Sequence, residues 1–312
     1  MRRICIIELL SAKMVKSFSA IREDELSNVI SSIRSMRGSI VNISEKMFWF
    51  TNSVSCRASF GKICKDRNEF ITIVKGVLSL IGGFDVADMF PSWKLLHNIS
   101  GVKSRLDIFL AGTETSSATI IWALAEMIKN PNVLAKAQSE VRQVFKGKKK
   151  YDEEDLEKLT YLNLVVKEAL RLHPRVPLIG PRECREQADI SGYTIPLKIR
   201  VLINAWALAR DPGCWDDPES FMPERFENSS IDFTGNYFDF IPFGAGRRMC
   251  QGMSFGLANV THALAQLLFT LTGSSLMELI QKNLDMTNIW ITATKKNDLL
   301  LVATNHSSNE VF

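Results

Sequence analysis

Residues 242–252 read PFGAGRRMCQG, and this short stretch decides how the rest of the sequence is interpreted. It places Cys250 directly downstream of Arg247 and Arg248, among glycines. An inert, buried cysteine prefers apolar neighbours, whereas neighbouring cations stabilise the thiolate. The stretch therefore predicts that Cys250 is held as a thiolate.

The stretch has the form F-x-x-G-x-R-x-C-x-G, and each fixed position has a physical role if Cys250 binds a haem iron. The thiolate would donate electron density and favour cleavage of an O–O bond. Gly246 permits a positive φ, so that amide N–H groups can turn toward the sulfur. Gly252 lets the following helix approach the haem ring, and the N-terminus of that helix stabilises the negative sulfur. Arg248 is placed to pair with a haem propionate, and Phe243 would pack near the sulfur and limit water.

Two other interpretations explain the cysteine stretch less well. A glycine-rich turn around a buried cysteine accounts for neither arginine. A nucleophilic cysteine would need a positioned histidine, and the four histidines of the chain are scattered along it.

A second motif, KEALR, supplies Glu168 and Arg171 three residues apart, on one face of a predicted helix. Most such pairs are solvated surface charges. This helix, however, is rich in leucine and valine, and the PERF stretch downstream offers Arg225 as a third member. We therefore expect a buried Glu168–Arg171–Arg225 network that fixes a loop against the helix.

A third motif, AGTETS, lies inside a long apolar helix and contains Gly112, Glu114 and Thr115. Polar residues in a buried helix need a reason, because an unpaired polar group is costly there. Glu114 could relay protons and Thr115 could hydrogen-bond a bound dioxygen. The alternative, that Thr115 only bonds a carbonyl one turn back, is equally good for this motif alone.

Taken together, these motifs resemble those of a plant cytochrome P450, of the large group that oxidises terpenoids and other specialised metabolites. The resemblance covers nearly all 312 residues and includes KEALRLHP, PRECRE, WALARDP and PERFE. It implies a haem with Cys250 as its axial thiolate ligand, Arg248 and Arg182 as propionate partners, and Glu114 with Thr115 as the dioxygen-activating pair. It also implies a substrate pocket lined by Leu110, Ala111, Val176, Leu178 and Ile179.

The same resemblance implies the reaction and the partners. A monooxygenase of this family inserts one oxygen atom of O2 into a small apolar substrate, and the resemblance points to a terpenoid. Its electrons would come from NADPH-cytochrome P450 reductase, and its location would be the cytosolic face of the endoplasmic reticulum membrane. A related possibility keeps the haem but rearranges peroxides, although the Glu114–Thr115 pair would then be unneeded.

The predicted fold is mainly α with a small β-sheet in the second half of the chain. Helices are expected through residues 1–80, over about 101–130, after Pro131, before Pro174 and from about residue 253. Paired short strands with a Gly-Tyr turn are expected over residues 188–209. No linker or repeat interrupts the chain, so residues 1–312 are predicted to be a single cytochrome P450 domain.

The resemblance also predicts that this fold is incomplete. The chain opens inside the third major helix of the family, and helices that roof the pocket are expected but missing between Leu106 and Asp107. Arg175 stands where the family often has a proline. A non-catalytic, truncated product that does not retain haem is therefore the alternative function.

Composition narrows the classes of function. The net charge of +4 is too small to indicate nucleic acid as a partner, although it would suit an acidic protein. The six cysteines include no C-x-x-C pair and are too sparse for a secreted disulfide scaffold. The apolar run after Arg2 and Arg3 is broken by Glu8, so we expect no membrane anchor from the sequence itself.

Overall fold

The structure is a computed structural model, and it describes residues 10–36, 38–61, 100–148, 152–271, 288–289, 294–295 and 297–302. Between residues 100 and 110 it describes the backbone but not the side chains. The described part is mainly helical, with short antiparallel strands, which confirms the predicted fold class.

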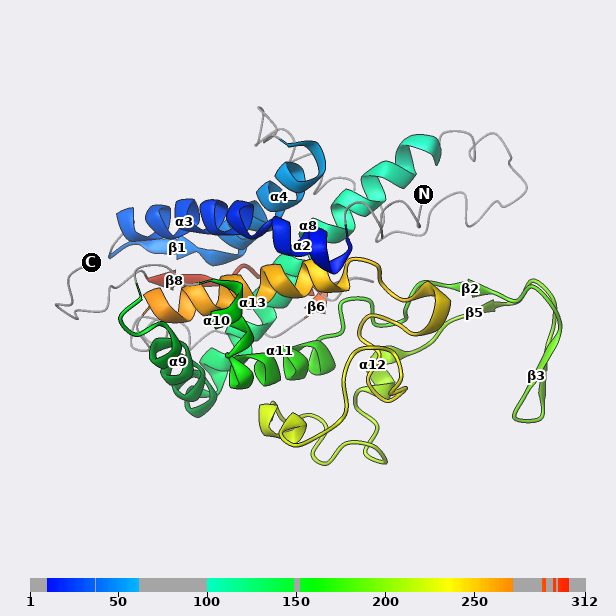
Figure 1. Cartoon of the computed structure of the whole chain (residues 1–312). Helices are drawn as coiled ribbons and strands as arrows, with labels where there is room; N and C mark the ends of the chain where they lie inside the picture. The colour runs from blue at the N-terminus through cyan, green and yellow to red at the C-terminus, as the bar shows by residue number, and fades with distance from the viewer. Residues whose placement is uncertain are drawn as a thin grey trace.

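Helix α8 (Ser100–Lys129) is the centre of the fold and runs obliquely through the helical body (Figure 1). It packs against α4 (Ile43–Phe60), α13 (Met253–Thr270) and α11 (Thr160–Leu172). Nearly every side chain from Thr113 to Ile128 is buried, because neighbours cover the helix on all sides. The prediction of a long helix buried all round is confirmed for this stretch.

The next two helices each begin at a local start signal, and the start of α9 at Pro131 was predicted. Helix α9 (Pro131–Phe145) starts with proline at its first turn, where the missing N–H would have no partner anyway. Helix α10 (Glu153–Glu157) starts with a capping box, in which Asp152 and Asp155 each accept the backbone N–H of the other. Helix α11 then ends at Leu172, ahead of Pro174, as predicted.

The first half of the chain is less uniformly helical than predicted. Helices α2 (Ala12–Ser17) and α3 (Ser19–Ser35) are followed by strand β1 (Ile40–Asn42), which the sequence analysis did not predict. Strand β1 pairs antiparallel with β8 (Leu300–Val302), so the beginning of the described chain is joined to its end. The expectation of helices alone in this region was wrong.

The strands form pairs rather than one small sheet, among the residues that the structure describes. They are β1–β8, β2–β5 (Arg182–Glu183 and Arg200–Val201), β3–β4 (Ala188–Ile190 and Tyr193–Ile195) and β6–β7 (Asn288–Ile289 and Thr294–Lys295). The β3–β4 hairpin turns at Ser191 and Gly192, which both have positive φ, rather than at the predicted Gly-Tyr pair. In Figure 1 this hairpin projects away from the helices.

The region between β5 and α13 is largely loop, and aromatic packing holds it together. It contains the short helix α12 (Ala205–Leu208), so the prediction of strands as far as residue 209 was wrong at its end. It also contains the two 3-10 turns η2 (Pro223–Phe226) and η3 (Gly246–Arg248). The rings of Phe226 and Phe240 are 5.1 Å apart, and both lie near Trp215. These buried rings form the part of the core that anchors the cysteine loop.

Candidate active site

The cysteine loop has a defined backbone that presents Cys250 just before α13. Gly244 and Gly246 have φ of 73° and 66°, values that a side chain would make costly. The N–H of Cys250 donates to the carbonyl oxygen of Phe243 at 2.9 Å, which closes the loop around turn η3. Helix α13 then begins with the bond from the N–H of Gly256 to the carbonyl oxygen of Gly252, at 2.8 Å; Gly252 is two residues after Cys250.

The surroundings of the thiol fit a large planar group with a metal at its centre. Cys250 is exposed even though its loop is formed. A Cβ added at Gly246 or Gly252 would meet nothing within 4 Å, so there is open space on both sides of the cysteine in the chain. A thiolate donor, cations for acidic groups and space beside them are the features that a haem requires.

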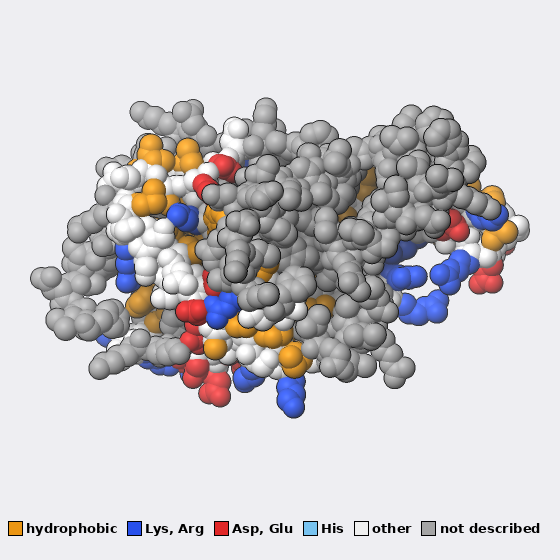
Figure 2. All heavy atoms as spheres, turned by 90° about the horizontal axis from the view of Figure 1, so that it is seen from above, with side chains coloured by type: hydrophobic (Ala, Val, Ile, Leu, Met, Phe, Trp, Pro, Cys, Tyr) orange, Lys and Arg blue, Asp and Glu red, His pale blue; other side chains and the backbone are white. Residues whose placement is uncertain are grey.

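The two arginines predicted to bind propionates lie on different elements. Arg248 is exposed in η3, and Arg182 is half-buried in β2, paired with Val201 of β5. Figure 2 shows Lys and Arg side chains gathered at the end of the molecule where β2 and β5 lie. Both arginines can offer a cation to an anionic group of a ligand, Arg182 from β2 and Arg248 from η3.

On α8, Glu114 is buried and Thr115 is partly exposed. The Thr115 hydroxyl donates to the carbonyl oxygen of Ala111, one turn back in the helix. This is the arrangement that the simpler interpretation of the motif predicts, and the hydroxyl can rotate from it toward a ligand. Ala111 itself is exposed, whereas the side chain of Leu110 lies outside the described residues.

The carboxylate of Glu114 faces a cation that sequence reasoning did not place there. Arg175, the first residue after the LHP stretch that ends α11, lies with Nη2 at 3.4 Å from Oε1 of Glu114. Both side chains are buried, at 6% and 10% exposure. The sequence does show arginine at position 175 where the family often has proline, but no local pattern in the sequence indicates that Glu114 is its partner.

The other predicted pocket residues follow Arg175 in a tight turn. The N–H of Ile179 donates to the carbonyl oxygen of Val176 at 3.0 Å, and Ile179 adopts a φ of 45°. The N–H of Trp206 bonds the carbonyl oxygen of Pro177 at 3.1 Å and fixes this turn to α12. Val176 and Leu178 are exposed, so the turn offers apolar side chains for contact with a ligand.

The structure also brings the three predicted network residues together. Arg171 donates from Nε and Nη2 to the two oxygens of Glu168, both at 2.8 Å, and both side chains are fully buried. Arg225 donates from Nε to Glu168 Oε1 at 3.0 Å. The N–H of Met222 bonds the same oxygen at 2.8 Å, so the carboxylate accepts hydrogen bonds from three residues, one on α11 and two at η2.

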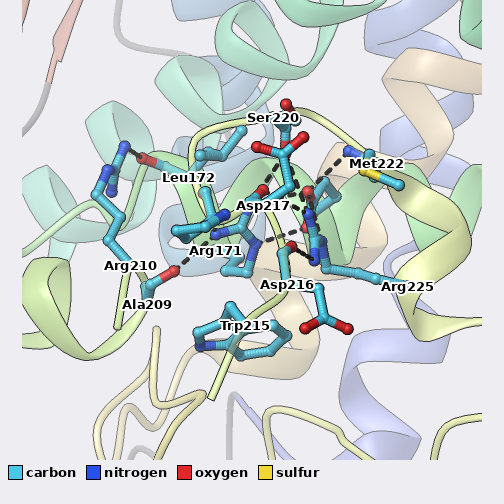
Figure 3. Close-up of polar contacts among 12 residues, drawn as sticks. Arg171, Leu172, Ala209, Arg210, Trp215, Asp216, Asp217, Ser220, Met222 and Arg225 are labelled. Atoms are coloured by element: carbon cyan, nitrogen blue, oxygen red, sulfur yellow. Dashed lines mark hydrogen bonds and ion pairs between the residues drawn. The ribbon is translucent and has the colours of Figure 1, made fainter. Parts of the chain in front are cut away.

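The arginines of this network use their remaining N–H groups to hold the loop before η2 (Figure 3). Arg171 donates to the carbonyl oxygens of Ala209 and Pro218 at 2.6 and 2.7 Å. Arg225 donates to those of Asp216 and Asp217 at 2.8 and 3.2 Å. The network therefore fixes the loop that leads into the cysteine stretch.

Comparisons with known proteins decide the family. The family model for cytochrome P450 matches residues 96–301. Premnaspirodiene oxygenase from Hyoscyamus muticus is 45% identical over 368 residues, which cover 97% of this chain and 73% of that protein. The 5-epiaristolochene 1,3-dihydroxylase from Nicotiana tabacum is 45% identical over 97% of this chain and 73% of its own length. This chain belongs to the cytochrome P450 family.

A third relative, germacrene A hydroxylase from Barnadesia spinosa, is 42% identical over 97% of this chain and 73% of its own length. Membership of the cytochrome P450 family makes the protein a haem-thiolate monooxygenase that uses O2, an organic substrate and a redox partner. Among the described residues, no helix of this cytochrome P450 is long and apolar enough to span a bilayer.

Another buried group in this cytochrome P450 was missed by sequence reasoning. The imidazole of His173 lies 2.7 Å from Glu126 Oε1 and stacks on the ring of Trp122 at 3.9 Å between centroids. Burial lowers the pKa of His173, and the charges of Arg210 and Arg175 act in the same direction. In the sequence, His173 and Pro174 indicate only the end of a helix. The contacts by which His173 joins the end of α11 to α8 depend on the fold.

Proposed function

We propose that this chain is a haem-thiolate monooxygenase in which Cys250 supplies the axial thiolate. The observation that carries the assignment is the exposed thiol in a closed loop at the start of α13, with its N–H bonded to Phe243. A helix N-terminus stabilises a nearby negative charge, and the glycine backbone leaves room for the ring. The haem, when bound, supplies the activation of O2.

The other predicted site residues would hold the haem and deliver protons. Arg248 and Arg182 would pair with the propionates, and Phe243, packed edge-on at 5.7 Å from Phe233, would limit water near the sulfur. Gly246 and Gly252 would leave room for the ring, since a Cβ at either position meets nothing within 4 Å. On α8, Glu114 Oε1 and Thr115 Oγ1 would hold and pass protons at the oxygen side.

We infer that the substrate is small, apolar and of the terpenoid class. The relatives with this level of identity are named for oxidising premnaspirodiene, 5-epiaristolochene and germacrene A. The described pocket residues Ala111, Val176, Leu178 and Ile179 carry apolar side chains, which suit a hydrocarbon, and Leu110 adds another in the sequence.

Electrons would reach the haem from NADPH-cytochrome P450 reductase, docking on the side of Cys250. The net charge of +4 favours an acidic partner surface of this kind. The cytosolic face of the endoplasmic reticulum membrane is the location we propose, on the grounds of the plant relatives.

The carbon monoxide difference spectrum of the reduced protein tests the assignment. We expect the red-shifted Soret band of a thiolate-ligated haem in the unaltered chain and its loss in Cys250→Ser. The matched control is Cys214→Ser, which changes another exposed cysteine and should keep the band. A band that survives Cys250→Ser would contradict the ligand assignment.

One observation favours a second candidate, a non-catalytic product that does not retain haem. The alignment with premnaspirodiene oxygenase is 368 residues long, more than the 312 residues of this chain, so the relative has aligned segments without a counterpart here. We propose that one such segment belongs at Leu106–Asp107, within the single domain formed by residues 1–312. Stoichiometric haem and turnover in the purified chain would exclude this candidate, and transcript reads across the junction would show whether the deletion is real.

A further inference from the structure

A row of aromatic rings connects the buried Glu168 network to the loop that presents Cys250. The rings of this aromatic row belong to Trp215, Phe226, Phe240, Phe233 and Phe243. At one end, the guanidinium carbons of Arg171 and Arg225 lie 5.3 and 5.9 Å from the ring centroid of Trp215 (Figure 3). Both distances are within the range of a cation–π attraction, so the network contacts the aromatic row at Trp215.

Phe240 is the ring through which the aromatic row continues. Its centroid lies 6.1 Å from that of Trp215 and 5.1 Å from that of Phe226. Its third neighbour is Phe233, at 6.5 Å, and Phe233 contacts Phe243 edge-on at 5.7 Å. Phe240 is only 1% exposed, whereas Phe233 and Phe243 are half-buried. Phe240 is therefore the buried ring that joins the two ends of the row.

The other end of the aromatic row fixes the backbone of the cysteine. The carbonyl oxygen of Phe243 accepts the N–H of Cys250 at 2.9 Å. The turn that contains Phe243 follows Phe240 directly and is closed by the N–H of Gly244, which bonds the carbonyl oxygen of Ile241 at 2.9 Å. Because protein interiors are close-packed, a buried ring restrains the backbone beside it. The position of the Cys250 N–H therefore depends on how Phe240 is packed.

We propose that Phe240 is a positioning residue for Cys250, because it transmits the restraint of the Glu168 network to the cysteine loop. The arginines of the network hold the loop before η2 through main-chain carbonyl oxygens, and the aromatic row extends this restraint to residues after η2. Without the ring of Phe240, the loop keeps its glycine turns but is less firmly attached to the core. The consequence for a bound haem rests on the proposed function, whereas the packing itself does not.

Amide hydrogen exchange of the full chain, resolved to the N–H of Cys250, tests the proposal without any need for haem. Exchange reports local opening of hydrogen bonds as well as global unfolding. We expect this N–H to exchange about 3–10 times faster in Phe240→Leu, the range that loss of an aromatic pair predicts. The N–H of Asn130, which bonds Glu126 at the end of α8, should keep its rate. An unchanged rate at Cys250 would overturn the proposal.

Two matched controls separate positioning from a general loss of stability. Phe145→Leu removes a ring that is also buried, at 2% exposure, but pairs with Phe269 between α9 and α13. It should destabilise the chain and leave the exchange of the Cys250 N–H unchanged. Phe238→Leu removes a ring that is 69% exposed, two positions from Phe240, and should change neither quantity. Equal acceleration at Cys250 by Phe145→Leu and Phe240→Leu would also overturn the proposal.

Phe233→Leu keeps the test decisive if Phe240→Leu does not fold. Phe233 is half-buried, so its loss should cost less stability, and its ring lies between those of Phe240 and Phe243. We expect faster exchange of the Cys250 N–H in this variant as well, by a smaller factor. A rate equal to that of the unaltered chain would show that the aromatic row does not reach the cysteine loop.

The haem-loaded chain gives a separate readout. On mild warming, Phe240→Leu should lose the red-shifted Soret band of the carbon monoxide complex sooner than Phe238→Leu, because its cysteine loop opens more often. Equal lifetimes of the band in the two variants would contradict the positioning role. If the unaltered chain shows no such band, the assignment of Cys250 as ligand fails, and the exchange rates still decide this inference.

Discussion

At the scale of single residues, the buried carboxylate of Glu168 is the centre of a charged hydrogen-bond network. It accepts hydrogen bonds from Arg171, Arg225 and the N–H of Met222, and it is fully buried. Glu168→Gln would leave two arginines without their counter-charge, so we expect the free energy of unfolding to fall by about 3–5 kcal/mol. Urea unfolding followed by circular dichroism measures the loss.

The control for this prediction is Glu219→Gln. Glu219 pairs with Arg210 at 3.3 Å but is 71% exposed, and solvent screens such a pair. We expect its removal to cost no more than about 1 kcal/mol. Equal losses in the two variants would show that burial of the Glu168 network adds nothing.

The imidazole of His262 on α13 predicts how stability depends on pH. Burial, with a smaller contribution from the charge of Arg22, lowers the pKa of His262 from 6.5 to about 4. The unfolded chain therefore binds this proton at a higher pH than the folded chain does. The stabilisation is complete above about pH 6.5 and is lost as the pH falls toward 4, by roughly 3 kcal/mol in all.

Unfolding free energies measured between pH 4 and 7 check this sign. His262→Gln, which does not titrate, should reduce the slope in that window. Burial also lowers the pKa of His173, so a smaller slope of the same sign should remain. A chain that grows more stable as the pH falls through this window would refute the prediction.

At the scale of elements, two glycines lie where α8 packs against its neighbours, and only one of them is at a tight contact. A Cβ at Gly112 would lie 3.5 Å from Oγ of Ser55 on α4, an ordinary contact, whereas one at Gly256 on α13 would lie 3.3 Å from Oγ of Ser116. We expect Gly112→Ala to stabilise the chain by about 0.5–1 kcal/mol, because alanine costs less backbone entropy in a helix.

Thermal unfolding of Gly112→Ala and Gly256→Ala measures how the stability change differs between the two positions. Gly256→Ala gains the same backbone entropy but must displace a neighbour by a few tenths of an ångström, so we expect a smaller gain or a loss. Equal stabilisation by both substitutions would show that the spacing between α8 and α13 is not limited by this glycine.

The elements also show what the sequence could predict and what it could not. Helices α8, α9, α11 and α13 followed from periodicity, prolines and length, which are local signals. Strand β1 has three residues, too few for a pattern, and its partner is at the other end of the chain. Its stability comes from that pairing and from burial of Val41, and neither can be read locally.

The candidate site follows the same rule: its locally marked parts were predictable from the sequence, and its long-range contacts were not. The cysteine loop and the Glu168 network are marked by residue types at fixed spacing, so the sequence named their members. The Arg175–Glu114 pair and the contact of His173 with Glu126 join residues more than forty positions apart. Such pairs depend on how α8 and α11 cross, and single-sequence patterns carry no information on that crossing.

At the scale of the whole molecule, exposed apolar side chains gather on the segments around the predicted pocket. Trp206 is fixed to the Val176–Ile179 turn through its N–H, and the residues of this surface are Val176, Leu178, Leu202, Ile203 and Trp206. Exposed apolar patches of this kind promote association in water. We expect the purified chain to bind a hydrophobic dye and to self-associate as its concentration rises.

Light scattering and dye fluorescence test this expectation with a pair of variants. Leu202→Ser should lower both signals, since Leu202 is 55% exposed within the surface. Phe238→Ser removes a more exposed ring elsewhere and should change them less. A larger effect of Phe238→Ser would place the association surface away from the pocket.

The pairing of β1 with β8 has a consequence for how the chain is made. Ser44 accepts the N–H of Leu299 across 255 positions, and Asn42 donates to Asp298 beside it. During synthesis, the contacts at the start of α4 therefore form only after residues 298–302, more than 250 positions later, have left the ribosome. Contacts of such sequence separation form slowly. The nascent protein spends that interval with an unpaired strand edge, which makes chaperone supply a determinant of yield.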